Sequence, residues 1–282
     1  MQLYRKNKVS AVIITYNEAG NLKHTLPQLY WCDEIIIVDS HSTDDTVALC
    51  QAYGCKIFYR NFSGYGEQKH FAIGKASNDW VLCIDADEYL TPALIDELQE
   101  ELTDTGDCRG YLVPMNLVFL GKEFSRGRES HRYFLRLFNK KWCEQGTQKV
   151  HERVEVRGPV KKLKNIIKHY SYNRVDNYLA KLGRYSTLGA EKNIAAGKKR
   201  PQALVFICVP IYFFRNYLIN GNIWNGKEGF YWSVLAAFSN FIKYIKMQEI
   251  SKRKSESEAN KIRSVVHPTS EESVHMMLSE HA

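Results

Sequence analysis

The stretch of residues 79–88 (DWVLCIDADE) restricts the possible folds of this chain more than any other part of it. Residues 80–84 form a short apolar run between polar residues, which is typical of a strand covered on both faces in a parallel sheet. Three carboxylates follow at once, those of Asp85, Asp87 and Glu88. Open α/β sheets bind ligands at the carboxyl ends of their strands, so the sequence places an acidic cluster at a ligand-binding edge.

Asp85 and Asp87 are two residues apart, so in extended chain their side chains point the same way, about 7 Å from each other. Without neutralisation, each carboxylate would raise the pKa of the other. A divalent cation shared with a ligand phosphate removes this cost, because Mg²⁺ binds one or two carboxylates together with phosphate oxygens. The alternative is a solvated acidic turn at the end of a strand, and the rest of the chain has to decide between the two.

Strands alternate with helices through the first hundred residues. The predicted strands are residues 9–15, 34–38, 55–60 and 80–84, and the predicted helices are residues 17–31, 43–53, 67–76 and 91–102. Pro27 is expected to kink or shorten the first helix. After residue 106 the alternation stops, and residues 107–160 are expected to carry mixed or antiparallel strands. The predicted fold is α/β, with a mostly parallel, Rossmann-like sheet that is flanked by helices.

The C-terminal part is expected to be a helical, aromatic and basic extension. Residues 204–219 are the most apolar stretch, and Pro210 and Arg215 interrupt it. The stretch is shorter than the ~20 residues that a spanning helix needs. It is expected either to pack on a membrane face or to form a buried core helix. The predicted regions are the sheet domain over residues 1–156, the helical region over residues 157–250 and a mobile charged tail over residues 251–282.

The net charge of +8 is concentrated in residues 157–200, where twelve Lys and Arg face two acidic residues, so the rest of the chain sums to −2. A local positive charge indicates an anionic partner, which is either an anionic membrane surface or a phosphorylated acceptor. Nucleic acid is disfavoured, because the segment belongs with apolar helices and contains no recognisable DNA or RNA module.

The seven cysteines are scattered and include no CxxC pair, which argues against a disulfide framework and against a zinc site. This usage suits a reducing compartment. The apolar run over residues 11–14 is too short for the core of a signal peptide. We therefore expect a cytoplasmic protein, attached peripherally to the inner face of the cytoplasmic membrane.

The ends of the first three predicted strands also carry polar residues that suit a nucleotide diphosphate. Tyr16 is placed to stack on a base, Asp39 to accept from a base N–H or a ribose hydroxyl, and Lys69 to meet a phosphate. Asp39, taken alone, is more often a simple turn residue. The chain contains no GxGxxG after its first strand and no GxxxxGK[ST], so dinucleotide and P-loop sites are poorly supported. A phosphatase with Asp85 as nucleophile would need a later acidic cluster that we do not find.

Three segments together resemble the family 2 glycosyltransferases, which have the GT-A fold: TYNE at 15–18, VDSHSTDDT at 38–46 and QKHFAIGKASNDWVLCIDADE at 68–88. The resemblance covers residues 9–155, and Lys69 stands where an arginine is common in the family. It implies that Asp85 and Asp87 hold the diphosphate of a nucleotide sugar through a metal, with Asp87 as the direct ligand. It also implies that Asp39 contacts the base.

The segments RYFLRLFNKKW at 132–142 and VHERV at 150–154 are similar to the branch of lipopolysaccharide-core glucosyltransferases that add β-linked glucose to inner-core heptose. Unlike many family members, the chain has no ED-type pair for the catalytic base. His151 and Glu152 are the nearest candidates, and Glu152 lies sixty-five residues after Asp87.

The predicted function is therefore inverting transfer of a hexose such as glucose from a UDP-sugar to a hydroxyl of a bacterial glycan or glycolipid, with Mg²⁺ or Mn²⁺ as cofactor. Glu152 is expected to be the general base, and His151 a further metal ligand beside Asp87 and Asp85. The residues expected to bind the donor are Thr15, Tyr16, Asn17, Glu18, Asp39, Lys69, Asp85 and Arg136. Arg126, Arg128 and Arg132 are candidates for the diphosphate or for an acceptor phosphate. The alternatives are a transferase for capsule or polyprenyl-linked glycan and a non-catalytic nucleotide-sugar-binding scaffold.

Overall fold

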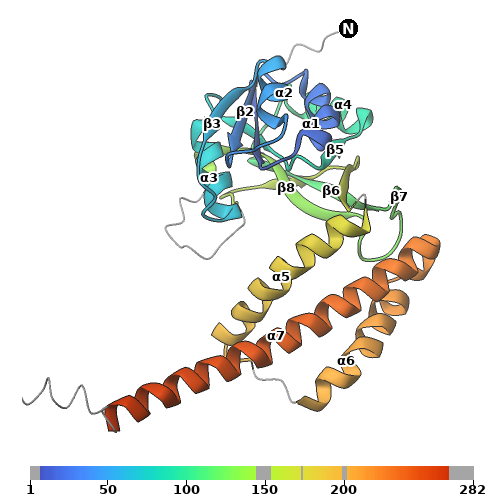
Figure 1. The fold of residues 1–282 in the computed structure, drawn as a ribbon. Helices are drawn as coiled ribbons and strands as arrows, with labels where there is room; N and C mark the ends of the chain where they lie inside the picture. The colour runs from blue at the N-terminus through green and yellow to red at the C-terminus, as the bar shows by residue number, and fades with distance from the viewer. Residues whose placement is uncertain (1–6, 144–153, 173, 199–201, 267–282) are drawn as a thin grey trace, which may run out of the picture. The chain divides into compact units, whose positions relative to one another are not determined.

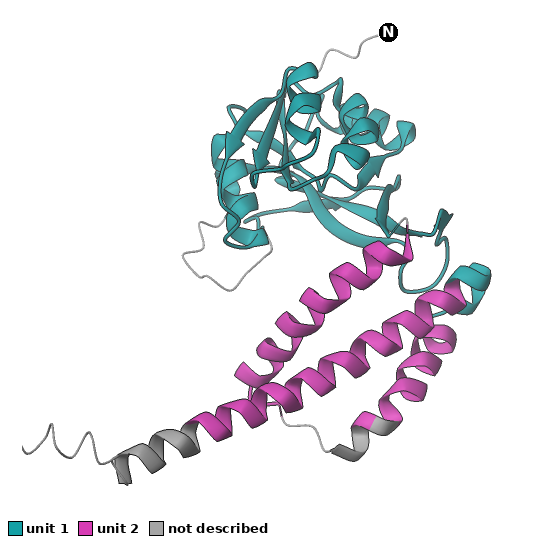
Figure 2. Ribbon diagram, in the orientation of Figure 1, with its two compact units in different colours: residues 1–173, 220–228 teal, residues 174–219, 229–282 magenta. Residues whose placement is uncertain are grey.

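The computed structural model describes residues 7–143, 154–172, 174–198 and 202–266 (Figure 1). The chain divides into two compact units (Figure 2). Unit 1 contains residues 1–173 and 220–228, and unit 2 contains residues 174–219 and 229–282. Unit 1 therefore takes its last segment from between two helices of unit 2.

The sheet of unit 1 has the strand order β3-β2-β1-β4-β8-β6-β10-β5, and two short strands, β7 and β9, pair with β6. The first four strands are parallel: β1 (Val9–Thr15), β2 (Glu34–Asp39), β3 (Lys56–Tyr59) and β4 (Trp80–Cys83). The others are β5 (Glu88–Leu90), β6 (Gly110–Phe119), β7 (Lys122–Glu123), β8 (Arg132–Asn139), β9 (Val160–Lys162) and β10 (Ile167–Tyr172). β8 runs antiparallel to both β4 and β6, as expected for a mixed second half.

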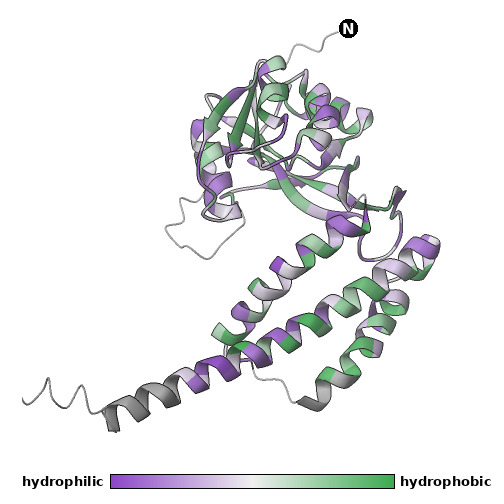
Figure 3. Cartoon of the chain, in the orientation of Figure 1, coloured by the Kyte–Doolittle hydropathy of each residue, from purple (hydrophilic) through white to green (hydrophobic). Residues whose placement is uncertain are grey.

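Helices cover both faces of the parallel half because its strands are apolar on both faces. Ala11 and Ile13 of β1 pack in one core cluster with Leu22, whereas Val12 packs with Ala72 in the other. These apolar strands stand out in Figure 3. The helices are α1 (Ala19–Thr25), α2 (Thr46–Ala52), α3 (Tyr65–Lys75) and α4 (Pro92–Glu101). The predicted α/β fold is confirmed.

The predicted effect of Pro27 on the first helix is also confirmed. The α-helix α1 ends at Thr25 and gives way to a 3-10 helix (Leu26–Leu29) that contains Pro27. Thr91 caps α4, since its hydroxyl accepts a hydrogen bond from the N–H of Leu94, and Pro92 occupies the first turn.

The sheet extends beyond the predicted boundary at residue 156. β9 pairs in parallel with β6, and β10 lies between β6 and β5, so residues 160–172 belong to the sheet and not to a helical region. Their sequence is dominated by charged and aromatic residues, and pairing with the buried strand β6 determines their conformation. Through this pairing β10 brings His169 to the acidic cluster.

Unit 2 is helical. Its elements are α5 (Val175–Ala195), α6 (Gln202–Phe214) continued by a π-helix (Arg215–Ile219), and α7 (Gly226–Val266), which begins in unit 1. Ala190, Val205, Cys208, Tyr244 and Met247 form its core. The charged tail predicted from residue 251 continues α7 to Val266, and residues 267–282 lie outside the described part. Among the helices described, none combines the length and the apolar character needed to cross a membrane.

Candidate active site

Thr15 and Asp39 end two neighbouring parallel strands and are paired in register. The hydroxyl of Thr15 donates to Oδ1 of Asp39 at 2.9 Å. The loop after β2 turns back on the same carboxylate, to which Ser42 donates through its N–H at 2.8 Å and through its hydroxyl at 2.5 Å. Asp39 is completely buried, so its carboxylate is held in a fixed place at the carboxyl edge of the sheet.

Residues 16–18 connect this edge to the loop after β2. Asn17, with a φ of 55°, donates its N–H to the Ser42 hydroxyl and accepts from the N–H of Thr43, each at 2.8 Å. The N–H of Glu18 donates to the Thr46 hydroxyl at 2.8 Å. Tyr16 is 59% exposed. Asn17 and Glu18 therefore hold the loops together, while the ring of Tyr16 remains accessible to a base.

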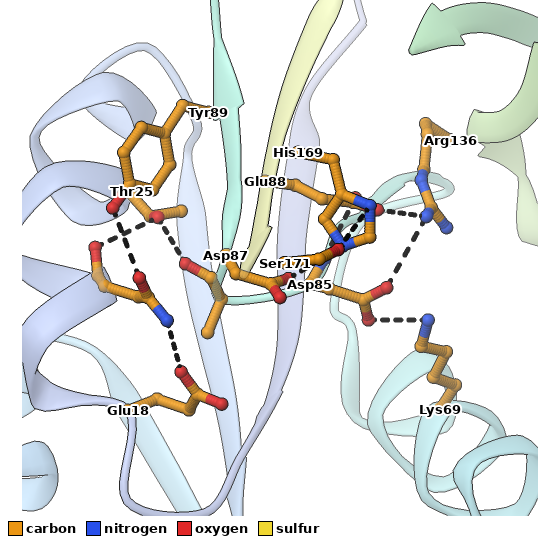
Figure 4. A network of polar contacts seen from close by, with 12 residues as sticks. Glu18, Thr25, Lys69, Asp85, Asp87, Glu88, Tyr89, Arg136, His169 and Ser171 are labelled. Carbon is orange, nitrogen blue, oxygen red and sulfur yellow. Dashed lines mark hydrogen bonds and ion pairs between the residues drawn. The ribbon is translucent and has the colours of Figure 1, made fainter. Parts of the chain in front are cut away.

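Asp85 lies between two cations, Lys69 of α3 and Arg136 of β8 (Figure 4). Lys69 Nζ is 2.6 Å from one carboxylate oxygen, and Arg136 Nη2 is 3.5 Å from the other. Burial raises the pKa of Asp85, but Lys69 and Arg136 outweigh it and lower that pKa to about 2. Lys69 and Arg136 therefore already neutralise Asp85 within the described residues, and the binding of a metal by Asp85 stays a prediction.

Glu88 holds the other side of Arg136. Its side chain is completely buried, forms an ion pair with the guanidinium, and accepts the N–H of Asp85 at 3.1 Å. Burial lowers the pKa of Arg136, but the carboxylates of Glu88 and Asp85 outweigh burial and raise that pKa above its usual value. The guanidinium therefore remains charged. Nε of Arg136 is buried and has no hydrogen-bond partner among the described residues. This N–H is therefore a buried donor that no acceptor in the described part of the chain satisfies.

Asp87 faces β10. Its Oδ1 is 3.3 Å from Nε2 of His169, and its carbonyl accepts the N–H of Tyr170 at 2.8 Å. Ser171 Oγ lies 2.7 Å from the same nitrogen of His169 (Figure 4). Burial lowers the pKa of His169, but the Asp87 carboxylate outweighs it and raises that pKa. Sequence reasoning missed His169, whose only signal was a polar side chain in the segment KHYSY at residues 168–172.

Asp87 and His169 are the described residues best placed to hold a metal ion. Together they supply one oxygen and one nitrogen ligand. In the described part of the chain, no three His, Cys, Asp or Glu residues gather in a way that could hold an ion. The predicted His151 and Glu152 lie in residues 144–153, outside the described residues.

Comparison with known proteins identifies the family of this chain. Residues 10–149 match the profile "Glycosyl transferase family 2". The lipopolysaccharide core biosynthesis glycosyltransferase LpsC of Rhizobium meliloti is 33% identical over 252 residues, which cover 86% of this chain and 93% of LpsC. An uncharacterized glycosyltransferase of Rickettsia bellii is 30% identical over 256 residues, covering 86% of this chain and 87% of that protein.

Among solved structures, that of S. aureus TarS 1-349 aligns with a TM-score of 0.43 at 16% identity, covering 88% of this chain and 92% of that one. The extent and identity of the match to LpsC decide the assignment. The chain belongs to the family 2 glycosyltransferases.

Proposed function

We propose that this glycosyltransferase moves a hexose from a UDP-sugar to a hydroxyl of a lipopolysaccharide core glycan, with inversion at the anomeric carbon. The acceptor class rests on the similarity to LpsC, a lipopolysaccharide core biosynthesis glycosyltransferase. The observation that carries the donor class is the arrangement of Lys69 and Arg136 around Asp85, beside Asp87 and His169. This arrangement combines fixed cations with a pair of possible metal ligands.

In this proposal the nucleoside binds over the ends of β1 and β2, where Asp39 accepts hydrogen bonds and Tyr16 stacks on the base. The diphosphate then extends toward the acidic segment 85–88. Lys69, paired with Asp85, and Arg136, paired with the buried Glu88 and with an unsatisfied Nε–H, lie there. Such preorganised donors stabilise the charge that develops on a leaving diphosphate without reorganising during the reaction.

The ligand pair formed by Asp87 and His169 fits a divalent ion that binds together with phosphate oxygens. When bound, Mg²⁺ or Mn²⁺ supplies Lewis-acid stabilisation of the leaving group. The chain itself holds the two ligands in place, since Tyr170 fixes the backbone of Asp87 and Ser171 contacts the ring of His169. His151 remains a proposed additional ligand.

We propose Glu152 as the general base that takes the proton of the acceptor hydroxyl. The test is transfer from UDP-hexose to the core oligosaccharide of a strain that lacks the gene, with the product anomer assigned by NMR. Glu152→Gln should lower kcat by about 10²–10⁴ while UDP-sugar binding is unchanged, because only proton removal is lost. Near-normal turnover would remove Glu152 from the mechanism, and retention of the donor's anomeric configuration would contradict inversion.

We further propose that unit 2 attaches the protein to the inner face of the cytoplasmic membrane. Three apolar side chains of α6, those of Ile207, Ile211 and Phe214, recur at helical spacing, and each is about half exposed. An amphipathic helix in the membrane interface buries such a face among the headgroups. The part of the basic segment that belongs to unit 2, residues 174–200, would supply attraction to anionic lipid.

A further inference from the structure

The loop before β8 is clamped by the segment of unit 1 that comes from between α6 and α7. We call residues 126–128 the arginine loop and residues 220–228 the clamp segment. The N–H of Arg128 donates to the carbonyl of Asn220 at 2.8 Å, and the amide of Asn225 donates to the carbonyl of Arg126 at 2.9 Å. Between them, Gly127 has a φ of 80°, and a Cβ there would lie 2.5 Å from the Asn220 carbonyl. The backbone of the arginine loop is therefore fixed from both ends.

The arginine loop lies at the active-site edge of the sheet. β8 runs antiparallel to β4, so it begins at the edge where β4 ends in the acidic segment. Along one face of β8, the ring of Phe134 lies between two arginines. The guanidinium carbon of Arg136 is 5.4 Å from the ring centre, and that of Arg132 is 5.3 Å from it. These three side chains form a row along β8, from the proposed donor phosphate site toward the arginine loop.

The strand order assigns the arginine loop to the acceptor side. The nucleotide is proposed to lie over β2, β1 and β4, whereas β8 and β6 are on the far side of β4. A ligand group bound beyond β8 therefore lies away from the nucleotide. In the proposed transfer, this side remains for the acceptor and its reacting hydroxyl.

The two arginines of the loop are exposed. Neither Arg126 nor Arg128 has an acidic partner within the described residues, whereas their neighbour Arg132 is paired with Glu129 at 3.2 Å. Two guanidinium groups on a fixed backbone are suited to forked hydrogen bonds with phosphate or carboxylate oxygens. We propose that Arg126 and Arg128 bind an anionic group carried by the acceptor glycan. This inference rests on the proposed glycosyl transfer and assigns its acceptor side.

The test measures KM for the core oligosaccharide of a strain that lacks the gene. In Arg126→Gln/Arg128→Gln, this KM should rise at least about tenfold, the equivalent of one lost charge-assisted contact. The KM for UDP-hexose and the rate of acceptor-independent hydrolysis should not change. Lys8→Gln/Lys164→Gln is the matched control, because it removes two exposed charges at the opposite edge of the sheet and should leave every constant unchanged.

Two further measurements identify the anion and test the clamp. The wild-type protein is assayed with a dephosphorylated and with a carboxyl-reduced preparation of the oligosaccharide. A raised KM for the first identifies the bound anion as a phosphate, and a raised KM for the second identifies it as a carboxylate. Gly127→Ala keeps both charges but displaces the arginine loop, and it should raise the acceptor KM while hydrolysis of the donor continues. Arg126→Lys/Arg128→Lys should give an intermediate acceptor KM, because lysine keeps the positive charge but cannot form the two parallel hydrogen bonds of a guanidinium group.

The proposal is overturned if the double Gln variant keeps an acceptor KM within twofold of the wild type. It is also overturned if that variant loses binding to phosphatidylglycerol vesicles while its acceptor KM is unchanged, because the anion would then be a lipid headgroup. Failure of the proposed function gives a different result. In that case the wild-type protein neither transfers from nor hydrolyses any UDP-hexose in the presence of Mn²⁺ or Mg²⁺.

Discussion

Asp87 and His169 approach each other from segments that are far apart in sequence, and a metal shared between them should report on donor binding. Asp87→Asn and His169→Ala should each abolish the Mn²⁺-dependent part of the rise in melting temperature that UDP produces, because ligand binding stabilises the folded state in proportion to its affinity. Thermal unfolding with UDP, with and without Mn²⁺, measures this effect. Asp79→Asn, at the opposite end of β4, is the control and should behave as wild type. An unchanged Mn²⁺ effect in both site variants would place the metal elsewhere.

Glu34 is a buried carboxylate far from the site, and it should control stability in acid. It accepts hydrogen bonds from Ser10 at 2.6 Å and from the N–H of Ser77 at 2.9 Å, and it pairs with Lys56. Burial raises the pKa of Glu34, but Lys56, Ser10 and Ser77 outweigh it and lower the pKa from 4.5 to about 2. Because the pKa is lower in the folded state, this stabilisation is complete above about pH 4.5 and is lost as the pH falls toward 2.

The free energy of unfolding should therefore fall by up to about 3 kcal/mol over that interval through Glu34 alone. Urea unfolding at a series of pH values measures the slope. Glu34→Gln should be less stable at neutral pH and should show a shallower acid limb. Equal acid limbs in the variant and the wild type would show that Glu34 does not titrate with an unusual pKa.

A site residue could be predicted from the sequence only where a local pattern marked its position. Asp39 and Asp85 follow apolar strands, so their place at the sheet edge follows from the strand assignment, and the structure brings Asp85 together with the predicted Lys69 and Arg136. The ion pair of Glu88 with Arg136 joins residues 48 positions apart, and no local signal announces it. His169 was missed for the same reason, since its role depends on the pairing of β10 with β5.

At the scale of elements, the strands with continuous apolar runs were predictable and the short polar ones were not. β1, β2 and β4 are buried on both faces, so composition alone marks them. β5, with three residues, and β9, whose residues are all exposed, exist because neighbouring strands offer them hydrogen bonds. Helix α6 retains Pro210 in its interior, a position that sequence rules treat as a break.

The exposed apolar face of α6 makes a testable element-level prediction. Ile211→Ser/Phe214→Ser should reduce flotation with anionic liposomes several-fold, because each exchange removes apolar area that the bilayer interface would bury. Both side chains are more than half exposed, so the free energy of unfolding should change by less than about 1 kcal/mol. Tyr30→Ser/Tyr53→Ser, in exposed positions of unit 1, is the control and should float as the wild type does. Equal flotation of all three proteins at low salt would contradict attachment through α6.

At the scale of the whole molecule, unit 1 is discontinuous in sequence, so the proposed acceptor side depends on a distant part of the chain. A protein that ends at residue 173 keeps Asp39, Lys69 and Arg136 but lacks the clamp segment. It should bind UDP with Mn²⁺ within about threefold of the full chain, a difference of less than 1 kcal/mol. Its acceptor KM should rise at least about tenfold, since the arginine loop loses both clamping hydrogen bonds.

Calorimetric titration with UDP and steady-state transfer assays measure the two quantities. Adding residues 174–228 back, in a chain that ends at residue 228, restores the clamp segment and should recover the acceptor KM. If the protein ending at residue 173 uses acceptor as well as the full chain does, the clamp segment has no part in acceptor binding.

The path of the chain through the clamp segment also has a mechanical consequence. The segment is nine residues long and connects the π-helix before it to α7, and its residues Asn220 and Asn225 hold the arginine loop. Because the clamp segment is so short, a force on either helix would act directly on the two hydrogen bonds that hold the arginine loop. If these helices attach to a membrane and the arginine loop binds the acceptor, as proposed, a force on the helices would change how the enzyme binds its acceptor.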